Sequence, residues 1–138
     1  MNKKYTSLGL MSGTSGDGVD ASIVKSDGNL TYAVIMDEYF EYNQALYQEI
    51  HETKDKVNSK LDLSKYSDAI NILEKKITIF HAELVNKIKK KFKFDLIGFH
   101  GQTIYHNSDE KISKQLGTGG LLSQLTFKDV VYNFREND

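Results

Sequence analysis

The amino-acid sequence predicts a single α/β domain, with a β-meander and helices packed on a mixed sheet. The first 40 residues contain strand-like segments separated by glycine-rich turns, and the remainder alternates helical with strand-like segments. The chain has 138 residues, of which 39% are hydrophobic and 27% charged. This length and composition are typical of one globular domain that buries its own core.

Composition also argues against several classes of protein. A net charge of -1 gives no general nucleic-acid or membrane surface, and no apolar run approaches the roughly 18 residues that span a bilayer. The chain has no cysteine, so disulfides and thiolate metal sites are excluded. We expect a cytoplasmic protein with no nucleic-acid or membrane partner.

Three strands are predicted in the first third of the chain. Tyr5–Met11 and residues 19–25 flank a glycine-rich turn, and residues 30–39 are rich in β-branched and aromatic side chains. Asp-Gly at the centre of residues 26–29 is a hairpin signal between the second and third strands. Together these segments predict a three-stranded antiparallel meander.

Two helices are predicted next. Residues 43–53 form a short one, and apolar residues recur every three or four positions from Ser64 to Phe92, as in a long amphipathic helix. Ser64 is the expected N-cap. The basic residues 87–93 suit the negative end of the helix dipole better than a nucleic-acid surface.

The last third alternates strand and helix. We expect one strand over residues 95–106, bent at a glycine, then a loop that opens a short helix within residues 117–127, and a final strand over residues 129–134.

The first candidate site is the sequence SGTSGDG, residues 12–18. Its glycines allow a tight turn with exposed N–H groups, and Thr14 and Ser15 add hydroxyl donors. Asp17 and Asp20 would repel a phosphate unless a cation or a water lies between carboxylate and phosphate, so they favour contacts through a metal ion. The pattern is neither a P-loop nor a Rossmann motif. From these residues alone, a plain hairpin turn and a phosphate-binding loop remain open.

Two more polar segments follow predicted strands. FHGQT, residues 99–103, has groups suited to hydrogen-bond a polyol or to position a nucleophile. Taken alone, the segment fits a strand end with a hydrogen-bonded core histidine better. The spacing of His100 and His106 does not favour a zinc site. Arg135 and Asp138 follow the last strand, where open α/β sheets place their active sites, but a solvated chain end is the alternative.

Read together, these segments resemble the anhydro-N-acetylmuramic acid kinase family. MSGTSGDGVD, residues 11–20, is similar to the family's M-S-G-T-S-L-D-G-V-D, and IGFHGQTIYH, residues 97–106, matches I-G-x-H-G-Q-T-x-x-H. NFREND, residues 133–138, resembles D-F-R-x-x-D, and residues 115–126 lie where the family has Q-[IL]-G followed by a helix. The resemblance covers essentially the whole chain but only the N-terminal part of the longer family proteins.

The resemblance implies that residues 1–138 are the N-terminal lobe of an actin-like ATPase (ribonuclease H-like) fold, with the C-terminal lobe absent from this chain. The implied reaction uses ATP and Mg²⁺ to phosphorylate 1,6-anhydro-N-acetylmuramic acid, with hydrolytic opening of the anhydro ring, in peptidoglycan recycling. A family-type homodimer is compatible with it.

The resemblance also implies roles for individual residues. Asp138 falls on the catalytic aspartate, which takes a proton from the attacking water. The first phosphate loop, which holds ATP, comprises Gly13, Thr14, Ser15, Gly16, Asp17, Gly18, Val19 and Asp20. The sugar side of the cleft is lined by His100, Gly101, Gln102, Thr103 and Arg135.

Three residues depart from the family pattern. Gly16 replaces a leucine and is expected to loosen the loop, Thr118 replaces an aspartate, and Asn133 replaces the aspartate of D-F-R. Since half of the nucleotide site belongs to the absent lobe, we expect no turnover by this chain alone. The alternatives are a non-catalytic sugar-binding or interaction module, or a degraded gene product without activity.

Overall fold

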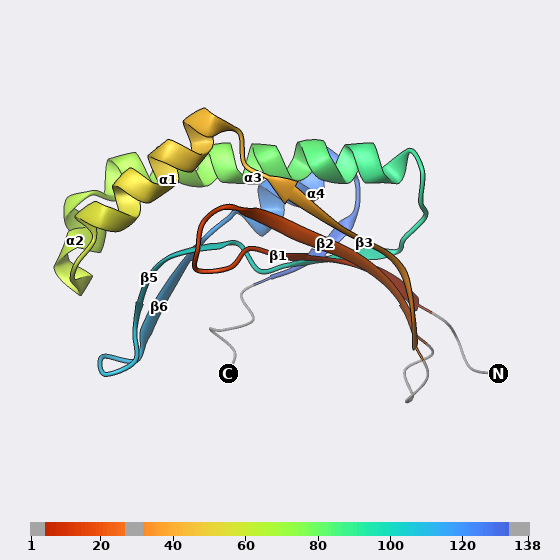
Figure 1. Ribbon diagram of the computed structural model, residues 1–138, viewed down its shortest axis with the longest axis horizontal. Helices are drawn as coiled ribbons and strands as arrows, with labels where there is room; N and C mark the ends of the chain where they lie inside the picture. Colours follow the sequence, from red (N-terminus) through yellow and green to blue (C-terminus); the bar gives the residue numbers. More distant parts are fainter. Residues whose placement is uncertain (1–4, 27–31, 133–138) are drawn as a thin grey trace.

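The computed structural model describes residues 5–26 and 32–132. Within them, a five-stranded sheet carries helices on one face, and a two-stranded hairpin extends beyond the end of that sheet (Figure 1). The α/β class and the mixed sheet are confirmed. The predicted turn at residues 26–29 lies largely outside the described residues, and Asn133, Arg135 and Asp138 lie entirely outside them.

The predicted meander is confirmed. Strands β1 (Tyr5–Met11), β2 (Gly18–Ser26) and β3 (Tyr32–Glu41) pair antiparallel in sequence order. Strand β4 (Leu96–Phe99) pairs parallel with β1, and β7 (Asp129–Val131) pairs parallel with β4. The strand order is therefore β3-β2-β1-β4-β7.

The helices are α1 (Gln44–Lys56), α2 (Lys60–Lys65), α3 (Ser67–Lys89) and α4 (Gly119–Thr126). The prediction of one helix starting at Ser64 is wrong, because Ser64 lies inside α2. Tyr66, with φ -104° and ψ 22°, ends α2 and precedes α3, so the backbone changes direction there. The apolar periodicity indicated which face is buried but did not reveal this break.

The prediction of a single strand over residues 95–106 is also wrong. The chain turns at Gly101, whose φ is +82°, so β4 belongs to the main sheet and β5 (Gln102–Asn107) to the hairpin. Its partner, β6 (Ile112–Leu116), was not predicted. A side chain at position 101 would bring its Cβ within 2.7 Å of the Leu116 carbonyl oxygen. Glycine therefore allows the sharp turn that separates the two sheets.

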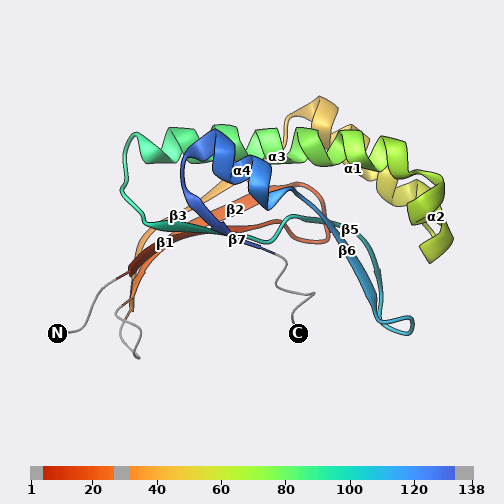
Figure 2. The same ribbon diagram turned by 180° about the vertical axis from the view of Figure 1, so that it is seen from behind.

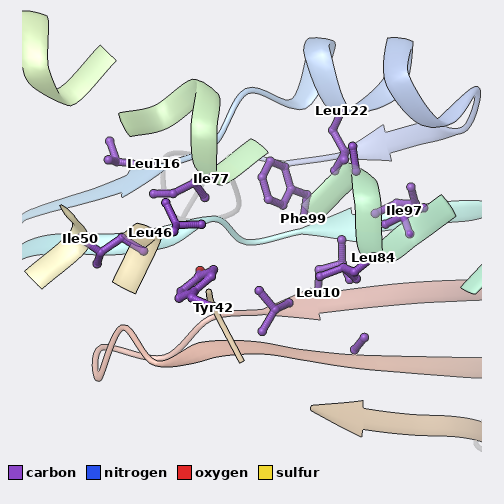
Figure 3. Packing of buried hydrophobic residues seen from close by; sticks show 14 of the residues in the cluster. Leu10, Tyr42, Leu46, Ile50, Ile77, Leu84, Ile97, Phe99, Leu116 and Leu122 are labelled. Atoms are coloured by element: carbon purple, nitrogen blue, oxygen red, sulfur yellow. The ribbon is translucent and has the colours of Figure 1, made fainter. Parts of the chain in front are cut away.

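The core lies between the sheet and the helices. Figure 3 shows Leu10 of β1, Phe99 of β4, Ile77 of α3 and Leu122 of α4 among its buried side chains. Along β2, residues that face the helices are buried and their neighbours face the opposite side. No described helix covers that opposite side (Figure 2).

The lysine-rich segment at the end of α3 has a structural role in this fold. Lys89 donates to the carbonyl oxygen of Thr126 at 2.5 Å, joining the end of α3 to that of α4.

No helix in the described ranges is long and apolar enough to cross a membrane.

Candidate functional site

The candidate residues gather at one edge of the sheet. Strands β1, β4 and β7 are parallel, so their carboxyl ends meet at that edge. The loop of residues 12–17 follows β1, His100 follows β4, and Tyr132 follows β7. The His100 backbone N–H donates to the Leu10 carbonyl oxygen at 3.2 Å, which joins the ends of β1 and β4 directly.

The segment between β1 and β2 is a compact turn, which we call the first loop (residues 12–17). The Gly16 N–H donates to the Gly13 carbonyl oxygen at 3.3 Å, and Gly16 has a φ of +71°. Thr14, Ser15 and Asp17 are exposed, whereas Ser12 and Gly16 are buried. The segment is therefore a hairpin connection that presents two hydroxyls and a carboxylate to solvent.

A buried hydrogen-bond network holds the start of the first loop. The Tyr42 hydroxyl donates to Gln102 Oε1 at 2.9 Å and lies 3.1 Å from Ser12 Oγ. Gln102 Nε2 donates to the carbonyl oxygens of Gly13, at 2.8 Å, and Thr103, at 3.0 Å. The residue after β1, the residue after β3 and the first residue of β5 thus meet beneath the loop.

Helix α1 holds the other side of the first loop. A Cβ at Gly16 would lie 3.2 Å from Ile50 Cγ2 and 3.3 Å from His51 Nε2, so the loop backbone packs closely on the helix. His51 Nε2 is 3.8 Å from Asp17 Oδ1, and Lys54 Nζ donates to the Thr14 carbonyl oxygen. Glycine at position 16 therefore fits a tightly packed turn of positive φ. The expected loosening relative to leucine stays a prediction.

These contacts engage the carbonyl oxygens of the first loop. They use the oxygens of Gly13 and Thr14, and the Asp17 oxygen accepts from the Tyr42 N–H at 3.0 Å. None of these contacts uses the backbone N–H groups of Gly13, Thr14 or Ser15. These three N–H groups therefore remain available as donors, which an anion site requires.

The last residues predicted for the phosphate loop lie within β2. Val19 is completely buried in the core. Asp20 is exposed, and a hydrogen bond with the Asp37 side chain raises the pKa of its carboxyl group, with desolvation and the Asp37 charge adding to the shift. Neither side chain therefore belongs to the tip of the loop.

The predicted sugar-lining residues are largely interior. Gly101, Gln102 and Thr103 are buried, and His100 is half-buried. The His100 Nδ1–H donates to the Gly101 carbonyl oxygen at 3.0 Å, and Thr103 Oγ1 accepts from Gln115 Nε2 at 3.2 Å. Of this segment, His100 is the residue best placed to meet a ligand through its side chain.

The segment before α4 is held by α3. The Gly117 N–H donates to Glu74 Oε2 and the Thr118 N–H to Thr78 Oγ1, each at 3.0 Å. The exposed Thr118 side chain makes no capping hydrogen bond to α4. A Cβ at Gly119 would meet the Tyr132 ring at 2.1 Å, so the start of α4 lies against the residue that follows β7.

Metal ligation has a limited basis in the described residues. They contain no cluster of three or more histidine, cysteine, aspartate or glutamate side chains that could hold an ion. A magnesium ion bound to nucleotide phosphates needs only one or two carboxylates from the protein. Asp17, exposed at the end of the first loop, is suited to that role, whereas Asp20 is directed to Asp37.

Sequence reasoning missed Tyr42, His51 and Glu74. Tyr42 lies between β3 and α1, and the other two lie within predicted helices, so each looked like an ordinary aromatic or surface residue. Their contacts with the first loop and with Gly117 arise only when the helices pack on the sheet. No local pattern in the sequence marks them.

Comparison with known proteins gives a consistent result. A sequence model described as anhydro-N-acetylmuramic acid kinase matches residues 5–138. Proteins of that name are similar to the chain: it is 59% identical over 140 residues to one from Pelagibacter ubique and 34% over 143 residues to one from Agrobacterium fabrum, and both alignments cover all of the chain. A third, from Crocosphaera subtropica, is 39% identical over 139 residues, which cover 95% of the chain.

The chain spans only part of these relatives. It covers 37%, 38% and 35% of their respective lengths, and the match to the first lies in its N-terminal part. With the family model matched over nearly the whole chain, the assignment is clear. The chain belongs to the anhydro-N-acetylmuramic acid kinase family.

Proposed function

We propose that this chain is the N-terminal lobe of an ATP-dependent kinase for 1,6-anhydro-N-acetylmuramic acid. The whole enzyme would hydrolyse the anhydro ring and form N-acetylmuramic acid 6-phosphate. The observation that carries the proposal is the junction of the two motif segments at one sheet edge, where Gln102 Nε2 donates to the Gly13 carbonyl oxygen. The first loop is suited to bind phosphate, and the segment that begins at His100 is suited to bind a sugar.

The fold supports an actin-like, ribonuclease H-like assignment. The described residues form a mixed sheet of order β3-β2-β1-β4-β7 with helices on one face, which is consistent with the lobe that the family resemblance implies. Its loops at the carboxyl ends of the parallel strands would face a cleft closed by a second lobe. We assign residues 1–138 to one lobe on this basis.

The first loop would bind the ATP phosphates. The backbone N–H groups of Gly13, Thr14 and Ser15 and the two hydroxyls are the donors on its exposed side. Asp17 would hold Mg²⁺, which neutralises phosphate charge when bound. The fixed loop supplies positioning, which phosphoryl transfer requires more than covalent assistance.

His100 and Arg135 would contact the sugar, and Asp138 would act as the general base. In this assignment Asp138 accepts a proton from water as the water oxygen bonds to the anomeric carbon. The bond from that carbon to the bridging oxygen, O6, breaks. The released O6 then takes the γ-phosphoryl group of ATP, and ADP leaves. Gly101, Gln102 and Thr103 would support this wall from behind. We place the reaction in cytoplasmic peptidoglycan recycling on the family resemblance.

A fusion protein tests the proposal. Residues 1–138 would be joined to the remainder of the Pelagibacter ubique relative, which is 59% identical over the shared segment. We expect phosphorylation of the anhydro sugar that depends on ATP, and none from the 138-residue chain alone, because its cleft has one wall. A folded fusion protein without activity would refute the proposal. Sugar binding without ATP-dependent turnover would favour a non-catalytic module.

A further inference from the structure

We propose that Tyr42 is a positioning residue that holds the first loop in its phosphate-binding geometry by linking it to Gln102. The inference rests on the proposed function, because it assigns Tyr42 to the nucleotide side of the same site. Tyr42 lies outside all of the family motifs quoted above, and its side chain is buried behind the loop.

The direction of each hydrogen bond in the network follows from chemistry. Gln102 Nε2 faces two carbonyl oxygens, which only accept, so this atom must be the amide nitrogen and Oε1 must face Tyr42. The Tyr42 hydroxyl then donates to Oε1 at 2.9 Å. Its oxygen is left to accept from Ser12 Oγ at 3.1 Å. One hydroxyl therefore fixes both Ser12 and the amide that holds Gly13.

Tyr42 also holds the opposite end of the first loop. Its backbone N–H donates to the Asp17 carbonyl oxygen at 3.0 Å. A single residue therefore binds the loop where it leaves β1, through the side chain, and where it enters β2, through the main chain. Thr14 and Ser15, which carry the candidate phosphate donors, lie between these two anchors.

The position of Tyr42 is itself well determined. The next residue, Asn43, is the N-cap of α1, and its side chain accepts from the Leu46 N–H at 2.9 Å. The Tyr42 ring packs edge-on against Phe80, with ring centroids 5.0 Å apart (the ring is labelled in Figure 3). Burial raises the pKa of Tyr42 to about 12, so the hydroxyl keeps its proton and continues to donate at neutral pH.

The substitution Tyr42→Phe in the fusion protein tests this inference, because it removes the hydroxyl and keeps the ring. We expect the KM for ATP to rise on the order of tenfold, since a buried hydrogen-bond network loses its centre, while the KM for the sugar changes less than about twofold. Tyr105→Phe is the matched control. It also removes the hydroxyl of a buried tyrosine, one that donates to Glu110 at 3.1 Å in the hairpin, and it should leave both KM values unchanged.

A double-mutant cycle separates positioning from general stability. If Tyr42 acts through Gln102, then Tyr42→Phe should have little further effect on the KM for ATP in a Gln102→Met background. Equal effects of Tyr42→Phe in both backgrounds would overturn the inference. So would an unchanged KM for ATP, or equal rises in both KM values.

Amide hydrogen exchange on the 138-residue chain tests the inference independently of activity. We expect Tyr42→Phe to speed exchange of the Gly16 N–H, which is bonded to the Gly13 carbonyl oxygen, by about tenfold relative to α3. Tyr105→Phe should show no such local change. Unchanged exchange at the first loop would overturn the positioning role. An inactive wild-type fusion protein whose loop exchange still depends on Tyr42 would refute the proposed enzyme function and leave the structural link intact.

Discussion

The first loop and the His100–Thr103 segment both carry family motifs, but their side chains differ in exposure to solvent. The first loop presents Thr14, Ser15 and Asp17 to solvent, whereas Gly101, Gln102 and Thr103 are buried. Gln102 uses its amide to hold the carbonyl oxygen of Gly13. In the proposed function, the exposed residues of a motif would meet the ligand and the buried ones would hold the ligand-binding backbone in place.

The largest expected effect comes from Gly101→Val. Position 101 needs a φ of +82°, and a new Cβ would approach the Leu116 carbonyl oxygen to 2.7 Å. We expect a loss of about 3–5 kcal/mol in the free energy of unfolding, measured in urea. Gly120→Ala is the control. That glycine lies in α4 with no atom near its hypothetical Cβ, so the change should stabilise by about 0.5–1 kcal/mol. Similar losses from both would show that the turn at Gly101 is not under this constraint.

The next effect concerns His81 of α3, whose ring lies 4.9 Å from that of Phe99, the residue before the His100–Thr103 segment. It is fully buried; desolvation lowers its pKa to about 4 from 6.5, partly offset by its hydrogen bond to the Ile77 carbonyl oxygen. Between these pH values the unfolded chain binds a proton that the folded chain does not. Stability should therefore fall as the pH drops from about 6.5 to 4, by about 3 kcal/mol in total.

Replacement of His81 checks this assignment. His81→Leu should remove most of the pH dependence in that interval while leaving the free energy of unfolding at pH 7 within about 1.5 kcal/mol of wild type. His106→Leu, at an exposed position of β5, should leave the pH dependence in place. If the free energy of unfolding of His81→Leu still fell with pH as steeply as that of wild type, the pH dependence would belong to other groups.

A smaller loss is expected for Gln102→Met, which removes one of the two hydrogen bonds made by the Tyr42 hydroxyl and one of the two accepted by the Gly13 carbonyl oxygen. We expect the free energy of unfolding, measured by heat or urea, to fall by about 1–3 kcal/mol. A variant as stable as wild type would contradict the scaffold role of Gln102.

The smallest stability effect is expected for Ser15→Ala in the first loop. Its side chain is exposed, so the free energy of unfolding should change by less than about 0.5 kcal/mol. In the fusion protein, affinity for ATP should nevertheless fall about fivefold, as for the loss of one hydrogen bond. A loss of stability comparable to that of Gln102→Met would remove the distinction between the two segments.

Local sequence patterns predicted much of the fold. Alternating apolar residues identified β1 and β2, and the helical periodicity identified the buried face of α3. The break at Tyr66 was missed because the apolar periodicity continues through it. A bend at a glycine was predicted within residues 95–106, but not that Gly101 divides them into strands of two separate sheets. The β6 strand was missed because KISKQL has only weak alternation and pairs solely with β5.

The candidate site was predictable in outline. Glycines, hydroxyls and the motif resemblance identified the two segments, and the parallel strands bring them to one edge. The roles of Gln102 and Tyr42 were not predictable, since they depend on hydrogen bonds between residues 60 positions apart. Burial, which only the folded structure reveals, separates these scaffold residues from the exposed donors.

Ligand-dependent hydrogen exchange in the fusion protein tests the central claim, that the two segments form one site, most directly. We predict that ATP with Mg²⁺ slows exchange in residues 12–18 and that the anhydro sugar slows it around His100, with the largest protection when both ligands are bound. Protection confined to other surfaces would contradict the claim. One such surface is the basic cavity near Lys89, Lys93 and Lys128, lined also by Phe92 and Phe94.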